Sequence, residues 1–366
     1  MHDLVRGKID KAVAEVIAAD LAATSDKFAA DIAALQLSTI SGGGGEGARE
    51  AQDCGRQVLT RAVGGVVDLW WGKSEDTEVA KPYMRISRAH LEKLRILFQR
   101  QRSAAEGGGT GGTGGTGGED GAAGEQPFLR AAFCLLLRYD ALGGHGYQAA
   151  VGEDAFDVLL AQLNCQQECF ASPFNCRYER FCSAFLDVDG PFGSIGSFFS
   201  PTFAPTRGCF QANPPFVPPV MEAMAAKIDK LLRSASGGLT FIVIVPAWTQ
   251  LPFWDSLASS EWLRAPVKLL AAADHGYCDG AQHQRRPDER HRPSSFDTGV
   301  FLLQNAAAFA SATAKSASRL DDVLAQFSHA MCLAKGRLND IQAYEQRVRG
   351  GKPGASRGRD GGHFGK

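Results

Sequence analysis

Apolar residues in the first part of the chain recur mostly at the spacing of amphipathic helices. The segments with this pattern are residues 4–21, 59–67, 85–102 and 127–143. In the second of them, Leu59, Val63 and Val67 follow one another every four residues. Between the last two lies a tract too rich in glycine to pack, near residues 104–126. The pattern therefore predicts an all-helical domain over residues 1–150 with a disordered glycine-rich insertion.

After residue 150 the pattern changes to short apolar runs that alternate with amphipathic segments. Strands are predicted at residues 167–172, 209–212, 239–247, 267–273 and 298–305, and helices at 153–164 and 217–235. The run TFIVIV is apolar throughout, which is typical of a strand covered on both faces. Strand–helix–strand order predicts right-handed crossovers and a three-layer α/β domain over residues 151–317. The last two strands have no helical pattern between them, so an antiparallel edge pair is expected.

The end of the chain differs again. Residues 318–349 predict one further helix, and residues 350–366 are basic, rich in glycine and expected to be disordered. With 366 residues, of which 44% are hydrophobic, the chain has enough apolar surface for a sizeable core. Its net charge of −1 excludes a general electrostatic attraction to nucleic acid, so any basic surface must be local.

The location of the protein is constrained by what the sequence lacks. Nine cysteines are scattered without the density of a disulfide scaffold, which fits a reducing compartment. The first residues show no apolar core of a secretory signal, and no run is long enough for a membrane span. We therefore expect a soluble protein in the nucleus or the cytoplasm, with no membrane partner.

One short stretch carries unusual chemistry. The sequence FQANPPFVPPV, residues 210–220, places an amide side chain beside two prolines and an aromatic residue, directly after a predicted strand. In an open α/β sheet, ligands bind at the carboxyl ends of the strands. The prolines stiffen the loop and remove backbone donors, which leaves carbonyl groups able to accept. The simpler interpretation is a turn, because Asn-Pro commonly starts one.

The chemical interpretation of this stretch is a clamp for an exocyclic amine. The side-chain oxygen of Asn213 and the backbone carbonyl of Pro214 would accept the two N–H bonds of an adenine amine. After Pro215, the ring of Phe216 would stack on the base. Positioning of this kind directs the nitrogen lone pair at an electrophile without a strong general base. The natural electrophile is the methyl group of S-adenosylmethionine, which would be the cofactor.

A pocket for this methyl donor is expected at the first strand of the sheet. The small residues of ECFASPFN let the methionine part approach the backbone, and two downstream aspartates are candidate acceptors for ribose hydroxyls. The candidate donor-binding residues are Ala171, Ser172, Pro173, Asn175, Asp187 and Asp189. For the aspartates, turn formation around Asp-Gly is an equally acceptable interpretation.

Several of these motifs occur together in one known family. ECFASPFNCRYERFCSAFLDVDGPFGSIGSF, FQANPPFVPPVMEAM, FIVIVPAW, HGYCDGAQH and TGVFLLQN follow in order over roughly residues 153–310. This combination resembles the phosphorylated CTD-interacting factor family of cap-specific adenosine N6-methyltransferases. A weaker resemblance runs to phage-type Dam DNA adenine methyltransferases.

The resemblance implies a Rossmann-like, S-adenosylmethionine-dependent methyltransferase sheet preceded by a helical domain. It implies methyl transfer to N6 of the adenosine, typically 2′-O-methylated, beside the 7-methylguanosine cap at the 5′ end of mRNA. Asn213, Pro214, Pro215 and Phe216 are then the catalytic motif. Animal members begin with a WW module, whose two tryptophans lie well apart. Here Trp70 and Trp71 are adjacent, so no WW module supports binding to the RNA polymerase II tail.

Residues that could hold the cap are harder to choose. Trp248, Phe253 and Trp254 follow a predicted strand and could sandwich the cap base, or pack on their own domain. The basic loop with Arg285, Arg286, Arg290 and Arg292, preceded by His283, could bind the triphosphate, or be a solvated loop. Four cysteines, Cys165, Cys169, Cys176 and Cys182, lack the spacing of a zinc site, and no metal is predicted.

Two other functions fit parts of the pattern. One is adenine N6 methylation of DNA or of internal RNA sites, which would not depend on a cap. The other is a noncatalytic protein of the same fold that binds caps or RNA. The intact motif at residues 213–216 argues against the second, since a protein without catalysis would be free to lose it.

Overall fold

The computed structural model describes residues 56–76, 78–80, 83–106, 125–143, 149–285, 289–313 and 320–332. The chain divides into two compact units, residues 1–55 and 56–366, and all described residues belong to the second. Several predicted features lie outside the described residues: the first helix, most of the glycine-rich insertion, Arg286, the later part of the last helix and the basic tail. Among the helices that are described, none is both long and apolar enough to cross a membrane.

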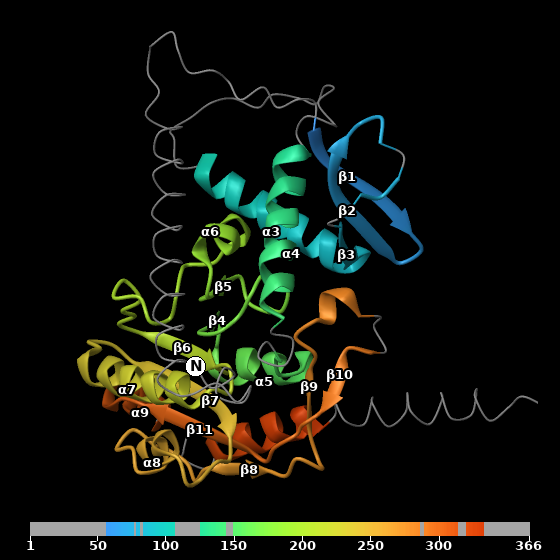
Figure 1. Ribbon diagram of the computed structural model, residues 1–366. Coiled ribbons are helices and arrows are strands. Elements are labelled where there is room, and N and C mark those ends of the chain that lie inside the picture. The colour runs from blue at the N-terminus through green and yellow to red at the C-terminus, as the bar shows by residue number, and fades with distance from the viewer. Residues whose placement is uncertain are drawn as a thin grey trace, which may run out of the picture. The chain divides into compact units, whose positions relative to one another are not determined.

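A three-stranded antiparallel sheet opens the described chain (Figure 1). It consists of β1 (Arg56–Val63), β2 (Val66–Lys73) and β3 (Tyr83–Ser87). The prediction of an all-helical domain over residues 1–150 is therefore wrong for this segment. The decisive local signal is the two-residue Gly64–Gly65 connection, with Gly64 at φ 60°, which joins Val63 to its cross-strand partner Val66. Such glycine turns form tight hairpins, and the apparent helical spacing does not outweigh them.

Two helices pack against this small sheet. They are α3 (Arg88–Glu106) and α4 (Gln126–Leu142), which confirms helices in the two segments predicted to hold them. Their apolar faces share one core with the inner face of the sheet, including Leu69, Ile86, Leu94 and Leu135, all fully buried. Phe174 of the next part of the chain belongs to the same core, so no sharp boundary falls at residue 150.

The main sheet has six strands in the order β5-β4-β6-β7-β11-β8. Their bounds are β4 (Gln167–Glu168), β5 (Arg180–Phe181), β6 (Gly208–Ala212), β7 (Leu239–Pro246), β8 (Lys268–Leu270) and β11 (Thr298–Gln304). The first four in that order are parallel, whereas β11 runs antiparallel to both β7 and β8. This confirms the predicted α/β class and the antiparallel pair at the edge. A separate pair, β9 (Gly276–Cys278) and β10 (His291–Pro293), is also antiparallel.

Helices cover both faces of the main sheet (Figure 1). Strand β7 is buried along its whole length: Phe241 and Val243 face one core, and Ile242 and Ile244 face the other. The first core includes α7 (Pro218–Ser234) and α8 (Pro252–Ala258). The second includes α5 (Glu153–Leu163) and the helical residues 320–332. The remaining helices are α6 (Leu186–Asp189), α9 (Ala306–Thr313) and the 3-10 turns η2 (Gly190–Phe192) and η3 (Gln282–Gln284). Because both faces of β7 are buried, its sequence is an uninterrupted apolar run.

Candidate active site

The amide motif lies where the topology predicts a ligand site. Strand β6 ends at Ala212, and residues 213–216 connect it to α7, whose first helical residue is Pro218. Strand β4 is the parallel neighbour of β6 and is followed by residues 169–175. Because the carboxyl ends of parallel neighbours meet at one edge, the two predicted binding segments lie side by side.

Of the two polar atoms in the Asn213 amide, one has a hydrogen-bond partner among the described residues and the other has none. Its side chain is 8% exposed, and Nδ2 donates to the backbone oxygen of Ala149 at 3.0 Å. A carbonyl oxygen can only accept, which fixes the orientation of the amide. Its Oδ1 is buried and finds no hydrogen-bond partner among the described residues. A buried acceptor left unpaired costs free energy, so the arrangement favours a ligand that brings an N–H bond to it.

A cavity of about 420 Å³ has Asn213 in its wall. Of the predicted residues, Ala171, Ser172, Asn175, Asn213 and Pro215 line it, whereas Pro173, Pro214 and Phe216 do not. Its other walls are mainly apolar, with aromatic rings from five further positions: Tyr139, Phe170, Phe185, Phe198 and Phe199. A volume and lining of this kind suit a small organic ligand, and we call it the donor cavity.

The turn after β4 is stabilised from within. Asn175 Oδ1 accepts from the backbone nitrogen and from Oγ of Ser172, at 2.7 and 3.1 Å. The Asn175 oxygen is therefore engaged in shaping the cavity wall rather than in reaching across it. Beneath the turn, the carboxylate of Glu168 accepts from the backbone nitrogens of Arg177 and Tyr178, at 2.6 and 2.8 Å. Burial raises the pKa of Glu168 to about 7, and those two hydrogen bonds oppose the rise.

The two aspartates predicted for the ribose lie outside the donor cavity. Asp187 is half exposed and pairs with Arg138 at 2.7 Å. Asp189 is fully buried, and its Oδ2 accepts from the hydroxyl of Tyr139 and from the backbone nitrogen of Phe185. Burial raises the pKa of Asp189 to about 6. Since Tyr139 and Phe185 line the cavity, Asp189 supports its wall from behind.

For two of the three aromatic residues considered for the cap, the structure favours the alternative of packing within their own domain. Phe253 and Trp254 sit in α8 with exposed fractions of 0% and 8%, as parts of the core. The ring of Trp254 meets Phe301 edge-on at 5.0 Å and lies over Gly299, where even a Cβ would approach it to 2.5 Å. In this structure neither ring is available to sandwich a base. Trp248 is only partly buried and packs edge-on against Phe296.

The residues considered for the triphosphate also lie in different surroundings. His283 is buried, with its ring stacked on Phe174 at 4.0 Å, so it joins the loop to the turn after β4. Arg285 lies 3.6 Å from the buried carboxylate of Asp279, which also pairs with Arg292. Within the described part of the chain, no cluster of residues is suited to hold a metal ion.

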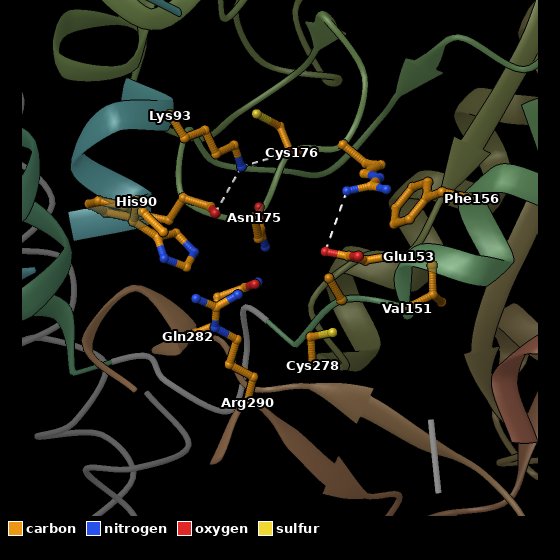
Figure 2. A pocket seen from close by; sticks show the side chains of 14 residues that line it. His90, Lys93, Val151, Glu153, Phe156, Asn175, Cys176, Cys278, Gln282 and Arg290 are labelled. Carbon is orange, nitrogen blue, oxygen red and sulfur yellow. Dashed lines mark hydrogen bonds and ion pairs between the residues drawn. The ribbon is translucent and has the colours of Figure 1, made fainter. Parts of the chain in front are cut away.

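Sequence reasoning did not identify a second cavity lined by basic residues. It lies between the start of α3, the turn after β4 and the segment before β10, and includes His90, Lys93 and Arg290 (Figure 2). One of its residues, Arg290, belongs to the basic loop that the sequence suggested for the triphosphate. Two others, His90 and Lys93, lie in the amphipathic helix predicted at residues 85–102. Nothing in the pattern showed that this helix faces the turn at residues 174–177.

Comparison with known proteins gives concordant matches. The family model described as "Phosphorylated CTD interacting factor 1 WW domain" matches residues 93–280, which are 188 of the 366 residues. The match begins within α3 and thus leaves out the strands β1 to β3.

Two relatives bear the name mRNA (2′-O-methyladenosine-N(6)-)-methyltransferase. The one from Mus musculus is 38% identical over 191 residues, and the one from Homo sapiens is 37% identical over 208 residues. The aligned regions cover 50% and 55% of this chain, but only 27% and 29% of the relatives' own length.

Proposed function

The chain belongs to the phosphorylated CTD interacting factor 1 family, and we propose that it methylates N6 of the adenosine beside the cap of mRNA. The proposal follows the names of the two relatives and the ordered motifs over residues 153–310. The observation that carries it is that Asn213, which lines the donor cavity, has a buried Oδ1 without a hydrogen-bond partner among the described residues. A central mixed sheet with one reversed strand is consistent with a Rossmann-like methyltransferase fold.

S-adenosylmethionine, bound in the donor cavity, would supply an electrophilic methyl group. The residues around the cavity fit such a molecule: Ala171 and Ser172 are small, and aromatic rings offer surfaces for a purine. In our proposal, Asn213 Oδ1 and the carbonyl of Pro214 accept the two N–H bonds of the adenine amine. This fixes the nitrogen lone pair toward the methyl group, so that catalysis comes from positioning and electrostatics.

The Asn213 amide is well suited to this task because it does not have to reorganise. The hydrogen bond from Nδ2 to Ala149 holds the side chain before any substrate binds. When the new N–C bond forms, the bond between the methyl group and the donor's sulfur would break, and S-adenosylhomocysteine would leave. The amine proton that is lost would pass to solvent, since no buried base lies in the cavity wall among the described residues. Phe216 packs edge-on against Tyr277 at 6.0 Å, and its stacking on the base remains part of the proposal.

The substrate is tested by methyl transfer to matched short oligonucleotides. A labelled donor is offered with RNA that begins with adenosine and carries either a 7-methylguanosine cap or a bare triphosphate, and with DNA. We expect transfer to N6 of the capped RNA only. Equal transfer to uncapped RNA or to DNA would favour the alternative of a general adenine N6-methyltransferase. No transfer, with donor binding intact, would favour a noncatalytic protein that binds caps or RNA.

A further inference from the structure

The basic cavity adjoins the donor cavity. It measures about 310 Å³, and Asn175 lines both. The segment at residues 149–150 connects them as well: Ala149 anchors Asn213 and lines the donor cavity, while Ala150 lines the basic one. Ala150 is in turn fixed to Cys278 by two backbone hydrogen bonds of 3.1 and 2.7 Å. A ligand held at Asn213 therefore has this cavity as its immediate neighbour.

Cationic groups predominate in its lining. The side chains that can carry a positive charge are His90, Lys93, Arg177 and Arg290, against the single carboxylate of Glu153. That carboxylate is already engaged, because Arg177 lies 3.4 Å from it (Figure 2). Burial lowers the pKa of His90 to about 3, and the charges of Lys93 and Arg290 act in the same direction. His90 is thus neutral at physiological pH, in a surrounding of positive potential.

The three cations differ in how far the protein already satisfies them. Lys93 donates to the backbone oxygens of Phe174 and Cys176, at 3.0 and 2.7 Å, and its role is to hold the turn. Arg177 is shared between Glu153 and Asp157. Both cations are engaged in structural contacts, which leaves Arg290 as the candidate for a ligand.

Arg290 is positioned by its backbone and open at its side chain. Its carbonyl accepts from the backbone nitrogen of Asp279 at 2.6 Å. Its Nε is buried and has no hydrogen-bond partner among the described residues. Figure 2 shows the guanidinium extending into the cavity toward His90 and Asn175. A planar cation with unused donors in a concave site suits a phosphate group, which takes two parallel hydrogen bonds from it.

We infer that this basic pocket receives the phosphate chain of the nucleotide whose adenine amine lies at Asn213, and that Arg290 is the residue that contacts it. The inference rests on the proposed function. In a nucleotide, the ribose separates the base from its phosphates, so the phosphates must lie in a neighbouring cavity rather than in the donor cavity itself. The donor cavity offers them no cationic side chain, whereas the basic pocket does.

The test measures binding of inorganic tripolyphosphate to the full chain by calorimetry. We compare the wild type with Arg290→Gln and with the control Arg100→Gln. Arg100 lies on α3, the helix that carries His90 and Lys93, but it pairs with Glu179 on the surface and does not line this pocket. Arg290→Gln is expected to weaken binding by about tenfold, the usual loss for one charge-assisted contact. Arg100→Gln is expected to change it by less than about twofold.

Equal binding by the wild type and Arg290→Gln would overturn the inference. So would equal losses in both variants, which would mean a diffuse attraction to surface charge. S-adenosylmethionine binding is measured in parallel, because an unchanged affinity for the donor shows that each variant is folded.

Methyl transfer to capped RNA separates this inference from the proposed function. Transfer with the same KM in the wild type and Arg290→Gln would leave the function standing and overturn the phosphate site. Tripolyphosphate binding that depends on Arg290, without transfer to any RNA or DNA, would support the phosphate site and overturn the function.

Discussion

The donor cavity and the basic pocket share a wall at Asn175, yet they are built in different ways. The donor cavity is largely apolar, and its key groups come from segments directly after two adjacent parallel strands. The basic pocket is charged and is assembled from α3, the turn after β4 and the segment before β10. A motif that follows a strand is positioned by the sheet topology alone, whereas the position of a charged pocket depends on how segments distant in sequence pack together.

The largest effect is expected in the donor cavity. Asn213→Ala removes the acceptor for the amine, and we expect kcat for methyl transfer to fall by about 10²–10³-fold, as for loss of one preorganised hydrogen-bonding group. Donor binding, measured by calorimetry, should remain within about threefold, because the amide oxygen faces the substrate. Activity close to that of the wild type would show that Asn213 is not part of the clamp.

The stability that Glu168 contributes beneath the turn after β4 should depend on pH. The folded-state pKa of Glu168, about 7, lies above the 4.5 of an ordinary glutamate. The stability that protonation provides is therefore fully present below pH 4.5 and is lost as the pH rises through about 7. Relative to Glu168→Gln, the wild type should lose roughly 3 kcal/mol of unfolding free energy over this window.

Denaturant unfolding at a series of pH values measures this difference. Glu179→Gln serves as the control, since that exposed carboxylate pairs with Arg100 at the surface. A difference between the wild type and Glu168→Gln that does not change with pH would contradict the buried, protonated state of Glu168.

Substitutions in the two cavities should also change different steady-state constants. Arg290→Gln is expected to raise KM for capped RNA by about tenfold with kcat nearly unchanged, because a phosphate contact holds ground state and transition state alike. Asn213→Ala should show the opposite division. A fall in kcat alone for Arg290→Gln would place this residue in the chemical step and remove the distinction between the cavities.

The smallest effect is expected at Asp187. Its ion pair with Arg138 is partly exposed, so Asp187→Asn should cost about 1 kcal/mol of stability or less. Since Asp187 does not line the donor cavity, the affinity for S-adenosylmethionine should change by less than about twofold. A tenfold loss in a binding titration would mean that Asp187 does reach the ribose.

Much of the main sheet could be predicted from the sequence, because its strands are continuous apolar runs with clear helices between them. The position of residues 213–216 between a strand and a helix could be predicted for the same reason. The small sheet β1–β3 was missed because Leu59, Val63 and Val67 fit a helical spacing by chance, while the Gly64–Gly65 turn carried the decisive information. Local spacing cannot distinguish these two structures when strands are short.

The cap site shows a different limit. Aromatic residues after a strand can line a surface site or pack in the core. For Trp254, the packing on β11 shows that it belongs to the core. Likewise, Arg290 could not be separated from its neighbours Arg285 and Arg292 by sequence. These two approach Asp279, whereas Arg290 lines the pocket.

The most direct test of the account is the coupling between Asn213 and the adenine amine. Binding of capped RNA is measured with S-adenosylhomocysteine present, for wild type and Asn213→Ala, with adenosine or with purine riboside, which lacks the amine, beside the cap. If Asn213 Oδ1 accepts from the amine, removing both groups should cost less than the two single changes together, with a coupling of about 1–2 kcal/mol. Effects that add within about 0.5 kcal/mol would contradict the clamp.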